Sequence, residues 1–227
     1  MLRRLFMSNS ILYKFWFNFF STGKSLLPIK NDLFYFGGHP RSGNSYFTNI
    51  LKEVYPDFKF SHHLHTIGAI KLAFKAKIPV IIIVREPLEC ISSLYVMNNS
   101  NNQLDNELIN KYIEYHKFLL AKENLIEVVV FEKLINNPQL ILDSLKKANI
   151  RLEIKEKDYD TLQKLVQSKF LKKKQLKMSD THALRFSSTP NESRTNLKKV
   201  IKKELIKNPH MDKANHLFKS LNRIYVL

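Results

Sequence analysis

Three short runs of apolar residues predict buried β-strands. The first, DLFYF at Asp32–Phe36, ends at the pair Gly37-Gly38, which is typical of a strand that enters a tight turn. The second, IPVIIIV at Ile78–Val84, is β-branched at every position after Pro79, so we expect a central strand covered on both faces. The third run is IEVVVF at Ile126–Phe131. Together they indicate the middle of a sheet.

Apolar residues at helical spacing separate these strands. One stripe predicts a helix that packs on the sheet and ends before Pro56. Pro87 suits the first turn of a second helix, and Leu108–Lys122 is expected to form a third. The apolar stripe of the first helix consists of Phe47, Ile50, Leu51 and Val54. That of the second helix consists of Leu88, Ile91 and Tyr95, and we expect both stripes to face the core.

Strands that alternate with helices are typical of a parallel sheet with right-handed crossovers. We therefore expect an α/β fold with three layers, in which a central, mostly parallel sheet is flanked by helices. The last third of the chain carries helical periodicity, so we expect a helical C-terminal third. The helices expected there span residues 138–148, 155–170, 192–206 and 211–224, and loops are expected at residues 96–103 and 171–190.

The composition indicates one basic globular domain. A chain of 227 residues suffices for one core, and we expect a single domain at residues 31–227 after a separate segment at residues 1–30. The net charge of +17 should attract polyanions such as nucleotides, nucleic acid, acidic glycans or anionic lipid. Because Cys90 is the only cysteine, an intrachain disulfide and a cysteine-rich zinc site are excluded, which favours a reducing, cytoplasmic setting.

The segment Met1–Phe20 combines two arginines with a bulky apolar run at Ile11–Phe20. Lys14 and Asn18 interrupt that run, whereas a membrane helix needs about 18 uninterrupted apolar residues. We therefore prefer a packed or interfacial helix over a signal or anchor segment. Such a helix predicts association with a membrane surface through the N-terminal segment, so the protein is expected to be cytoplasmic or peripheral to a membrane.

The segment Gly38–Ser45 (GHPRSGNS) has the G-x-x-x-x-G spacing of a phosphate-binding P-loop and lies between a predicted strand and a predicted helix. Nucleotide triphosphatases have lysine where this chain has Asn44, so Arg41 is the cation that the loop offers. They also need an acidic magnesium ligand after a second strand, but here Arg85 follows that strand. These two differences disfavour a nucleotide or small-molecule kinase, which remains the alternative enzyme.

Arg85 and Ser93 form a second candidate anion site. Ser93 lies opposite the apolar stripe of its predicted helix, so we expect its hydroxyl to face away from the core and to be available to a ligand. Arg85 lies at a strand end, and open α/β folds bind ligands at the carboxyl edge of the sheet. An ordinary surface arginine is the competing interpretation.

Together these segments resemble the sulfotransferases that use 3′-phosphoadenosine 5′-phosphosulfate (PAPS). In that family a P-[KR]-S-G-T-T-W loop binds the 5′-phosphosulfate, and R-x-P-x-x-x-x-x-S binds the 3′-phosphate. Residues 40–46 (PRSGNSY) and 85–93 (REPLECISS) are similar to these motifs, and residues 128–138 (VVVFEKLINNP) are similar to a third family segment. The resemblance implies a P-loop-type fold, PAPS as donor and PAP as product, with no metal. The donor-binding residues that it implies are Arg41, Ser42, Gly43, Asn44, Ser45, Tyr46, Arg85 and Ser93.

The chain departs from this family at several positions. Asn44 and Tyr46 replace the usual threonine and tryptophan, and Lys133 replaces an acidic residue. The C-terminal R-K-G segment of many animal members is missing. Residues 187–194 (SSTPNESR) resemble the corresponding segment of bacterial members, which implies that Arg194 is a further contact to the 3′-phosphate.

The cluster Ser61–His65 (SHHLH) lies where the family's K-T-H-x-P segment carries the catalytic base. The aligned pattern implies His63 as this base, and His65 competes because neither the lysine nor the proline is reproduced. Histidine suits the role because its pKa lies near neutrality, while Arg41 would neutralise charge on the leaving phosphate. Metal chelation by the three histidines and ordinary loop histidines are the alternatives.

The acceptor is expected to be a hydroxyl or an amine of a small molecule, a glycan or a lipid. The lysines at residues 172–174 and 198–207 are interpreted first as solvated charge, and otherwise as a surface that attracts an acidic acceptor. A basic nucleic-acid-binding protein is the alternative from another class. It is disfavoured because the aromatic residues lie in apolar runs and are not interleaved with basic residues, so we expect no nucleic-acid partner.

Overall fold

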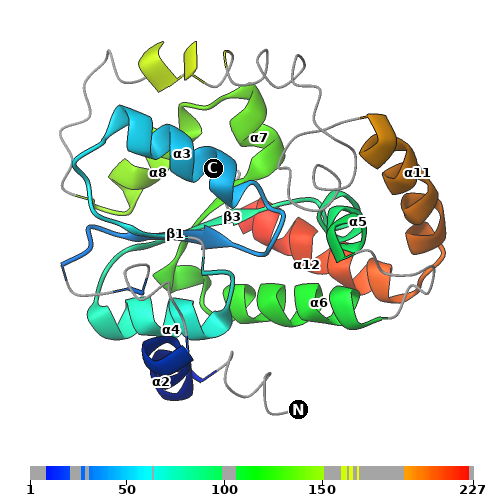
Figure 1. The fold of residues 1–227 in the computed structure, drawn as a ribbon, viewed down its shortest axis with the longest axis horizontal. Helices are drawn as coiled ribbons and strands as arrows, with labels where there is room; N and C mark the ends of the chain where they lie inside the picture. The colour runs from blue at the N-terminus through cyan, green and yellow to red at the C-terminus, as the bar shows by residue number, and fades with distance from the viewer. Residues whose placement is uncertain are drawn as a thin grey trace.

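Figure 1 shows the computed structural model of the chain, in which a central sheet lies between helices. The structure describes residues 9–20, 27–28, 31–62, 64–98, 106–150, 160–162, 164–165, 168 and 192–224.

Four parallel strands form the sheet in the order β2-β1-β3-β4. The central pair is in register from Tyr35 opposite Val80 to Gly38 opposite Ile83. This confirms the predicted α/β fold with a parallel sheet flanked by helices. The strands are β1 (Tyr35–Gly38), β2 (Ser61–His62), β3 (Val80–Val84) and β4 (Glu127–Val130).

Helices follow each strand, and residues 192–224 form two helices, as the periodicity predicts. Among them, α5 begins at Pro87, and α11 spans residues 192–206 as expected. Most of the helix expected at residues 155–170 and the whole loop expected at residues 171–190, with the lysines at 172–174, lie outside the described residues. The helices of the first half are α2 (Ser10–Phe20), α3 (Asn44–Val54), α4 (Ile67–Ala76) and α5 (Pro87–Asn98). The later elements are α6 (Glu107–Leu120), the 3-10 turn η2 (Glu123–Leu125), α7 (Phe131–Asn136), α8 (Leu140–Lys147), α11 (Glu192–Ile206) and α12 (His210–Ile224).

The two faces of the sheet bury different side chains of the same strands. Ile81 and Ile83 of β3 pack with α3, α7 and α8 on one face, while Val80, Ile82 and Val84 pack with α4 and α6 on the other. This alternation follows from the two-residue period of a strand, and the β-branched run supplies an apolar side chain to both faces. The prediction that Ile78–Val84 contains a doubly covered strand is therefore confirmed.

A third apolar cluster joins α5 to the C-terminal helices. Ile91 and Tyr95 of α5 are buried here, as the predicted stripe requires, with Leu205 of α11. One face of α12, with Met211, Ala214 and Leu217, closes the cluster. As a result α11 and α12 are fixed beside α5, at the carboxyl end of the sheet (Figure 1).

The predicted boundaries differ from the structure mainly around β1 and β2. The first strand is shifted from residues 32–36 to Tyr35–Gly38, because the backbone of Gly37 and Gly38 continues the pairing with β3. A β-carbon at Gly38 would collide with the carbonyl oxygen of Ile83, so only glycine permits this pairing. The sequence did not predict β2, α4 or the short helix α7.

The N-terminal helix α2 packs against α4. Tyr13 is 1% exposed and lies in the apolar cluster beneath the sheet, and burial raises the pKa of its phenol to about 12. The outer residues Ile11 and Phe15 are exposed. Within the described residues, none of the helices is both long and apolar enough to cross a bilayer.

The order of the strands creates a ligand position between β1 and β3. The chain leaves β1 toward β2 on one side of the sheet and leaves β3 toward β4 on the other. The connections that follow β1 and β3 therefore diverge from adjacent strand ends. In open α/β sheets this divergence forms the crevice in which ligands bind.

Candidate functional site

The loop from Gly38 to Asn44 leaves β1 and turns sharply into α3. Arg41 has φ 71° and Gly43 has φ 93°, and the Ser42 amide donates to the His39 carbonyl at 3.1 Å. A β-carbon at Gly43 would collide with the ring of Phe131, so glycine is required there for space as well as for conformation. The loop is thus a tight turn that is closed by a hydrogen bond within its own backbone.

Asn44 ties the loop together from the inside. Its Nδ2 donates to the carbonyls of His39 at 3.0 Å and Gly38 at 3.4 Å, and the residue is 4% exposed. Its Oδ1 is buried and accepts no hydrogen bond from any described residue. The asparagine that replaces the lysine of nucleotide triphosphatases therefore directs its amide group into the loop, where it supports the backbone.

The first turn of α3 faces the same loop. Gly43 is its N-cap residue, and no side chain in the described part of the chain caps the helix there. The first amides of a helix lack intrahelical partners and carry partial positive charge, which makes this end suited to a phosphate. Ser45 is exposed at this end, and Tyr46 packs edge-on against Phe47 with ring centroids 5.0 Å apart.

Ser42 differs from its neighbours because its side chain is fully buried. The hydroxyl lies 3.8 Å from the sulfur of Cys90, and the Cys90 thiol donates to the Pro40 carbonyl at 3.1 Å. Burial raises the pKa of the Cys90 thiol to about 11, so the thiol stays protonated. The side chain of Ser42 therefore joins the loop to α5.

Arg85 extends from the end of β3 to the loop. Its Nη1 donates to the Arg41 carbonyl at 2.9 Å, and its guanidinium carbon lies 4.4 Å from the centre of the Phe131 ring. The Tyr112 hydroxyl donates to the Arg85 carbonyl at 2.7 Å and fixes the backbone. Nε of Arg85 is buried, lies 3.9 Å from a Glu132 oxygen and makes no hydrogen bond to the described residues. The two anion motifs of the sequence therefore meet at one place.

Ser93 contacts the loop from the opposite direction. Its hydroxyl accepts a hydrogen bond from Nε of Arg41 at 2.9 Å. The hydroxyl does point away from the Ile91 and Tyr95 stripe, but Ser93 is only 6% exposed, so the expected outward-facing position is wrong. The reason is that α5 is enclosed by α6, α11 and the loop. Ser93 is thus linked to Arg85 through a single residue, Arg41.

Glu89 is the central group that the sequence analysis missed. Its carboxylate lies 3.7 Å from Nη2 of Arg85 and forms ion pairs with Lys198 and Lys202 of α11. These two lysines were interpreted as solvated charge, whereas the structure places them against α5. The available signal was spacing, because Glu89 lies four residues before Ser93 on one side of the same helix and only four residues after Arg85.

Beneath the loop lies a group of buried aromatic and titratable residues. His39 is packed edge-on against Tyr112, with His116 6.0 Å away between ring centroids. Burial, and then the neighbouring His116, hold the pKa of His39 well below its usual 6.5. Burial lowers the pKa of His116 to about 4. Both histidines are therefore neutral at pH 7, and the buried residues beneath the loop carry no charge there.

Two of the three candidate base residues lie in the described part of the chain, and His63 lies outside it. His62 is buried in β2 beside Phe60. Nδ1 of His65 lies 2.9 Å from the Gly38 carbonyl oxygen and 3.3 Å from Nδ2 of Asn44. Since a carbonyl can only accept, the shorter contact places the proton on Nδ1 and the lone pair on Nε2. That tautomer is the one a general base requires at Nε2.

One further candidate, Arg194, can be located only in part. Arg194 lies in the first turn of α11, and its side chain is outside the described residues. No group of three or more His, Cys, Asp or Glu side chains suited to a metal ion occurs among the described residues.

Comparison with known proteins gives little beyond this geometry. No protein-family model matches the chain, and no curated protein matches its sequence. Among solved structures, mouse sulfotransferase SULT7A1 complexed with PAP matches with a TM-score of 0.48 and 12% identity, over 88% of this chain and 91% of that chain. A likeness of this size carries no argument about activity.

Proposed function

We propose that the protein is a sulfotransferase that moves a sulfuryl group from PAPS to a hydroxyl or an amine. The observation that supports this most is the junction of the two anion motifs, in which Arg85 donates to the Arg41 backbone and the Arg41 side chain donates to Ser93. One nucleotide with two separate anionic ends would be bound by such a junction. PAPS is a nucleotide of that kind.

The residues present suit this donor. The uncapped start of α3 offers amides to the 5′-phosphosulfate. The guanidinium of Arg85 lies against the loop and offers a charged partner to the 3′-phosphate. A loop closed by Asn44 and Gly43 keeps these groups in place before the nucleotide arrives.

The alternatives fit the same residues less well. A P-loop kinase would need a lysine at position 44, but the buried Asn44 amide is used by the loop carbonyls. It would also need an acidic residue where Arg85 follows β3. A nucleic-acid-binding surface would require exposed aromatic rings among basic residues, whereas near this loop Tyr112 is buried and Tyr46 and Phe131 are partly buried.

The proposed reaction balances without a redox partner. The acceptor oxygen or nitrogen forms a bond to sulfur, the bond from sulfur to the 5′-phosphate oxygen breaks, and PAP leaves with that electron pair. The acceptor proton passes to a histidine, for which we propose His65 or His63. His65 is favoured among the described residues because the Gly38 carbonyl holds the proton on Nδ1 and leaves Nε2 to accept. Arg41 would neutralise charge on the leaving phosphate.

The acceptor side of the proposal rests on charge. With a net charge of +17, the surface favours an acidic acceptor, such as a glycan or a lipid headgroup. Screening an acceptor library with labelled PAPS and reading the products by mass spectrometry would identify the class. An acidic acceptor should lose more turnover than a neutral one when the salt concentration is raised.

The donor site is tested by calorimetric titration of PAP in the absence of metal. Wild type is expected to bind PAP, and Arg85→Ala should weaken binding about 100-fold, or ~2.7 kcal/mol, because a partly buried phosphate partner is lost. Arg223→Ala, which removes an exposed arginine on α12, is the matched control and should change affinity less than twofold. Equal PAP affinity in the Arg85 variant and wild type would reject the site.

The base is tested separately by turnover. His63→Ala and His65→Ala should each retain PAP affinity, and the variant that lacks the base should lose turnover by 100-fold or more. If both variants turn over normally, neither histidine is the base. A variant that loses PAP affinity as well would indicate a role in the loop, which for His65 would follow from its contact with Gly38.

A further inference from the structure

Glu89 of α5 lies between the two proposed ligands of the 3′-phosphate and faces α11. Glu89 and Ser93 are four residues apart in the helix and so share a face. Arg85 lies two residues before the helix begins, with its Nη2 3.7 Å from the Glu89 carboxylate. The Glu89 carboxylate therefore lies beside the position where the phosphate would bind.

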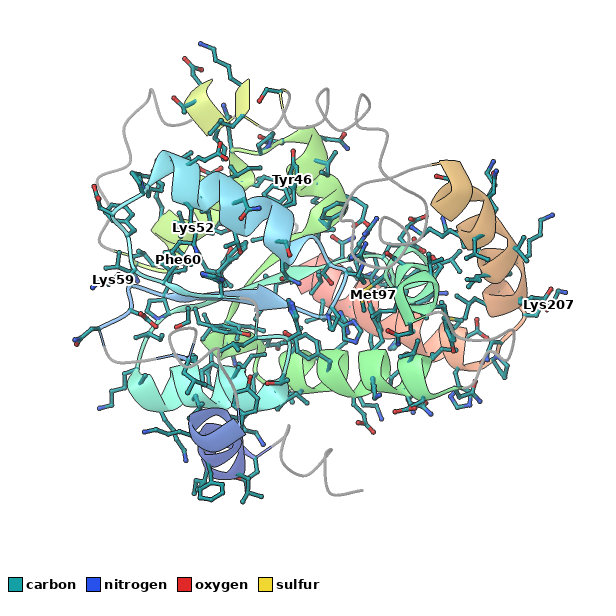
Figure 2. All side chains as sticks on the ribbon, viewed as in Figure 1. Tyr46, Lys52, Lys59, Phe60, Met97 and Lys207 are labelled. Carbon is teal, nitrogen blue, oxygen red and sulfur yellow. The ribbon has the colours of Figure 1, made fainter. Side chains whose placement is uncertain are left out.

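Two lysines of α11 extend from the neighbouring helix to this row. Lys198 pairs with Oε2 of Glu89 and Lys202 pairs with Oε1. The two lysines are also four residues apart, so one face of α11 supplies both. Figure 2 shows Met97 on α5, on the side of that helix toward α11. Lys198 and Lys202 are partly buried, whereas Lys199 and Lys203 of the same helix are exposed.

A single carboxylate consequently faces three cations. Nη2 of Arg85 lies 3.7 Å from Oε2 of Glu89, the same oxygen that Lys198 contacts. Glu132 lies on the other side of Arg85, so the three cations face two carboxylates and one positive charge is left over. The side chains of Arg85, Glu89, Lys198 and Lys202 are only 19% to 30% exposed, so solvent screens this charge less than it would on an open surface. An anion with two or more oxygens could bridge Arg85 and Lys198 in the place of Glu89.

We propose that Lys198 and Lys202 are ligands of the donor's 3′-phosphate, and that Glu89 is the anion that holds them there until the nucleotide binds. This inference rests on the proposed function and extends its donor site to α11. Lysine suits an exchange of this kind because its ammonium is a point charge on a flexible stem, whereas arginine favours one planar geometry. The carboxylate keeps the lysines oriented before the nucleotide binds. The phosphate carries more negative charge, so it replaces the carboxylate as their ion-pair partner.

A purely structural interpretation makes the opposite prediction. If the lysines serve only to fasten α11 to α5, their loss should lower stability and leave the discrimination between nucleotides unchanged. If they bind the 3′-phosphate, their loss should reduce affinity only for nucleotides that carry that group. PAP and adenosine 5′-phosphate differ in the 3′-phosphate alone, so their ratio of affinities separates the two interpretations.

The test is calorimetric titration of the full chain with PAP and with adenosine 5′-phosphate. The double variant Lys198→Gln, Lys202→Gln should lose at least tenfold in PAP affinity and less than twofold in adenosine 5′-phosphate affinity. Lys199→Gln, Lys203→Gln is the matched control, because it removes the same charge from exposed positions of the same helix. The control should leave the ratio of the two affinities within twofold of wild type.

Glu89→Gln supplies a second measurement, in which the two interpretations predict opposite changes in PAP affinity. Removing the competing anion should strengthen PAP binding several-fold, whereas loss of a fastening residue should weaken it. An unchanged affinity ratio in the double lysine variant, or weaker PAP binding in Glu89→Gln, would overturn the inference while wild type still binds PAP. Failure of wild type to bind PAP would instead refute the proposed function. Because the ratio is independent of the folded fraction, partial destabilisation of a variant leaves the result readable.

Discussion

The ends of β1 and β3 lie side by side, but they are stabilised by different interactions. The loop after β1 is closed internally by neutral hydrogen bonds, such as those from Asn44 to the loop carbonyls, and it contains the uncharged His39. Arg85 adds one charged donor to this loop, at the Arg41 carbonyl. The segment after β3 is held by charges, with Arg85 between Glu89 and Glu132. Backbone geometry stabilises the segment after β1, and a balance of charges stabilises the segment after β3.

This difference indicates a division of work in the proposed donor site. A loop that is closed by its own backbone presents the same amides whether or not a nucleotide is bound. A group of ion pairs can exchange partners, because each cation can replace a carboxylate with a phosphate. The loop after β1 should therefore be rigid, and the ion pairs after β3 should be able to change partners.

The largest effect is expected from Gly38→Ala. The added methyl group would collide with the Ile83 carbonyl oxygen, and backbone in a central strand cannot yield without breaking the pairing of β1 with β3. We expect a loss of about 3 kcal/mol in the free energy of unfolding, measured in urea. Gly37→Ala is the control, since there the methyl would meet the Tyr35 side chain, and a smaller loss is expected. Equal losses would show that the β1–β3 contact is not the constraint.

The sequence predicted most of the fold because the fold depends on local patterns. The β-branched run of β3 and the apolar stripe of α3 each identify an element without reference to the rest of the chain. The strand β2 was missed because two residues carry no pattern. Helix α4 did have a local signal, since the Thr66 side chain caps it by accepting from the Ala69 amide.

The candidate site was predictable only in part, because its contacts join distant residues. Motif spacing identified Arg41 and Arg85, and their convergence follows from parallel strands that end at one edge. The burial of Ser93 and the pairing of Glu89 with Lys198 depend on where α11 packs. A helix more than a hundred residues further along the chain leaves no local signal of that packing.

A moderate loss in the free energy of unfolding is expected at acid pH, because of the buried histidines His39 and His116. His39 and His116 have pKa values below the unfolded value of about 6.5, so the unfolded chain binds more protons as the pH falls. Stability should therefore decrease below about pH 6.5, and the contribution of His116 should continue down to about pH 4. Between pH 7 and 5.5 we expect a loss of about 1 kcal/mol for each histidine.

Urea unfolding at several pH values measures this slope, and His116→Phe provides the matched variant. Phenylalanine keeps an aromatic ring against Tyr112, whose ring centroid is 3.7 Å from that of His116, and removes one titrating group. The variant should retain about half of the pH dependence. A slope identical to that of wild type would mean that His116 is not neutral in the folded protein.

The smallest effect is expected where the charges are exchangeable. Lys202→Gln breaks one ion pair with Glu89, and since Lys198 still contacts that carboxylate, we expect the free energy of unfolding to fall by less than ~1 kcal/mol. Lys111→Gln, which breaks an exposed pair with Glu107, is the control and should cost about 0.3 kcal/mol. A loss above ~2 kcal/mol from Lys202→Gln, measured in urea, would mean that the charges after β3 are structural. In that case they could not be released to a phosphate, and the two strand ends would be equally rigid.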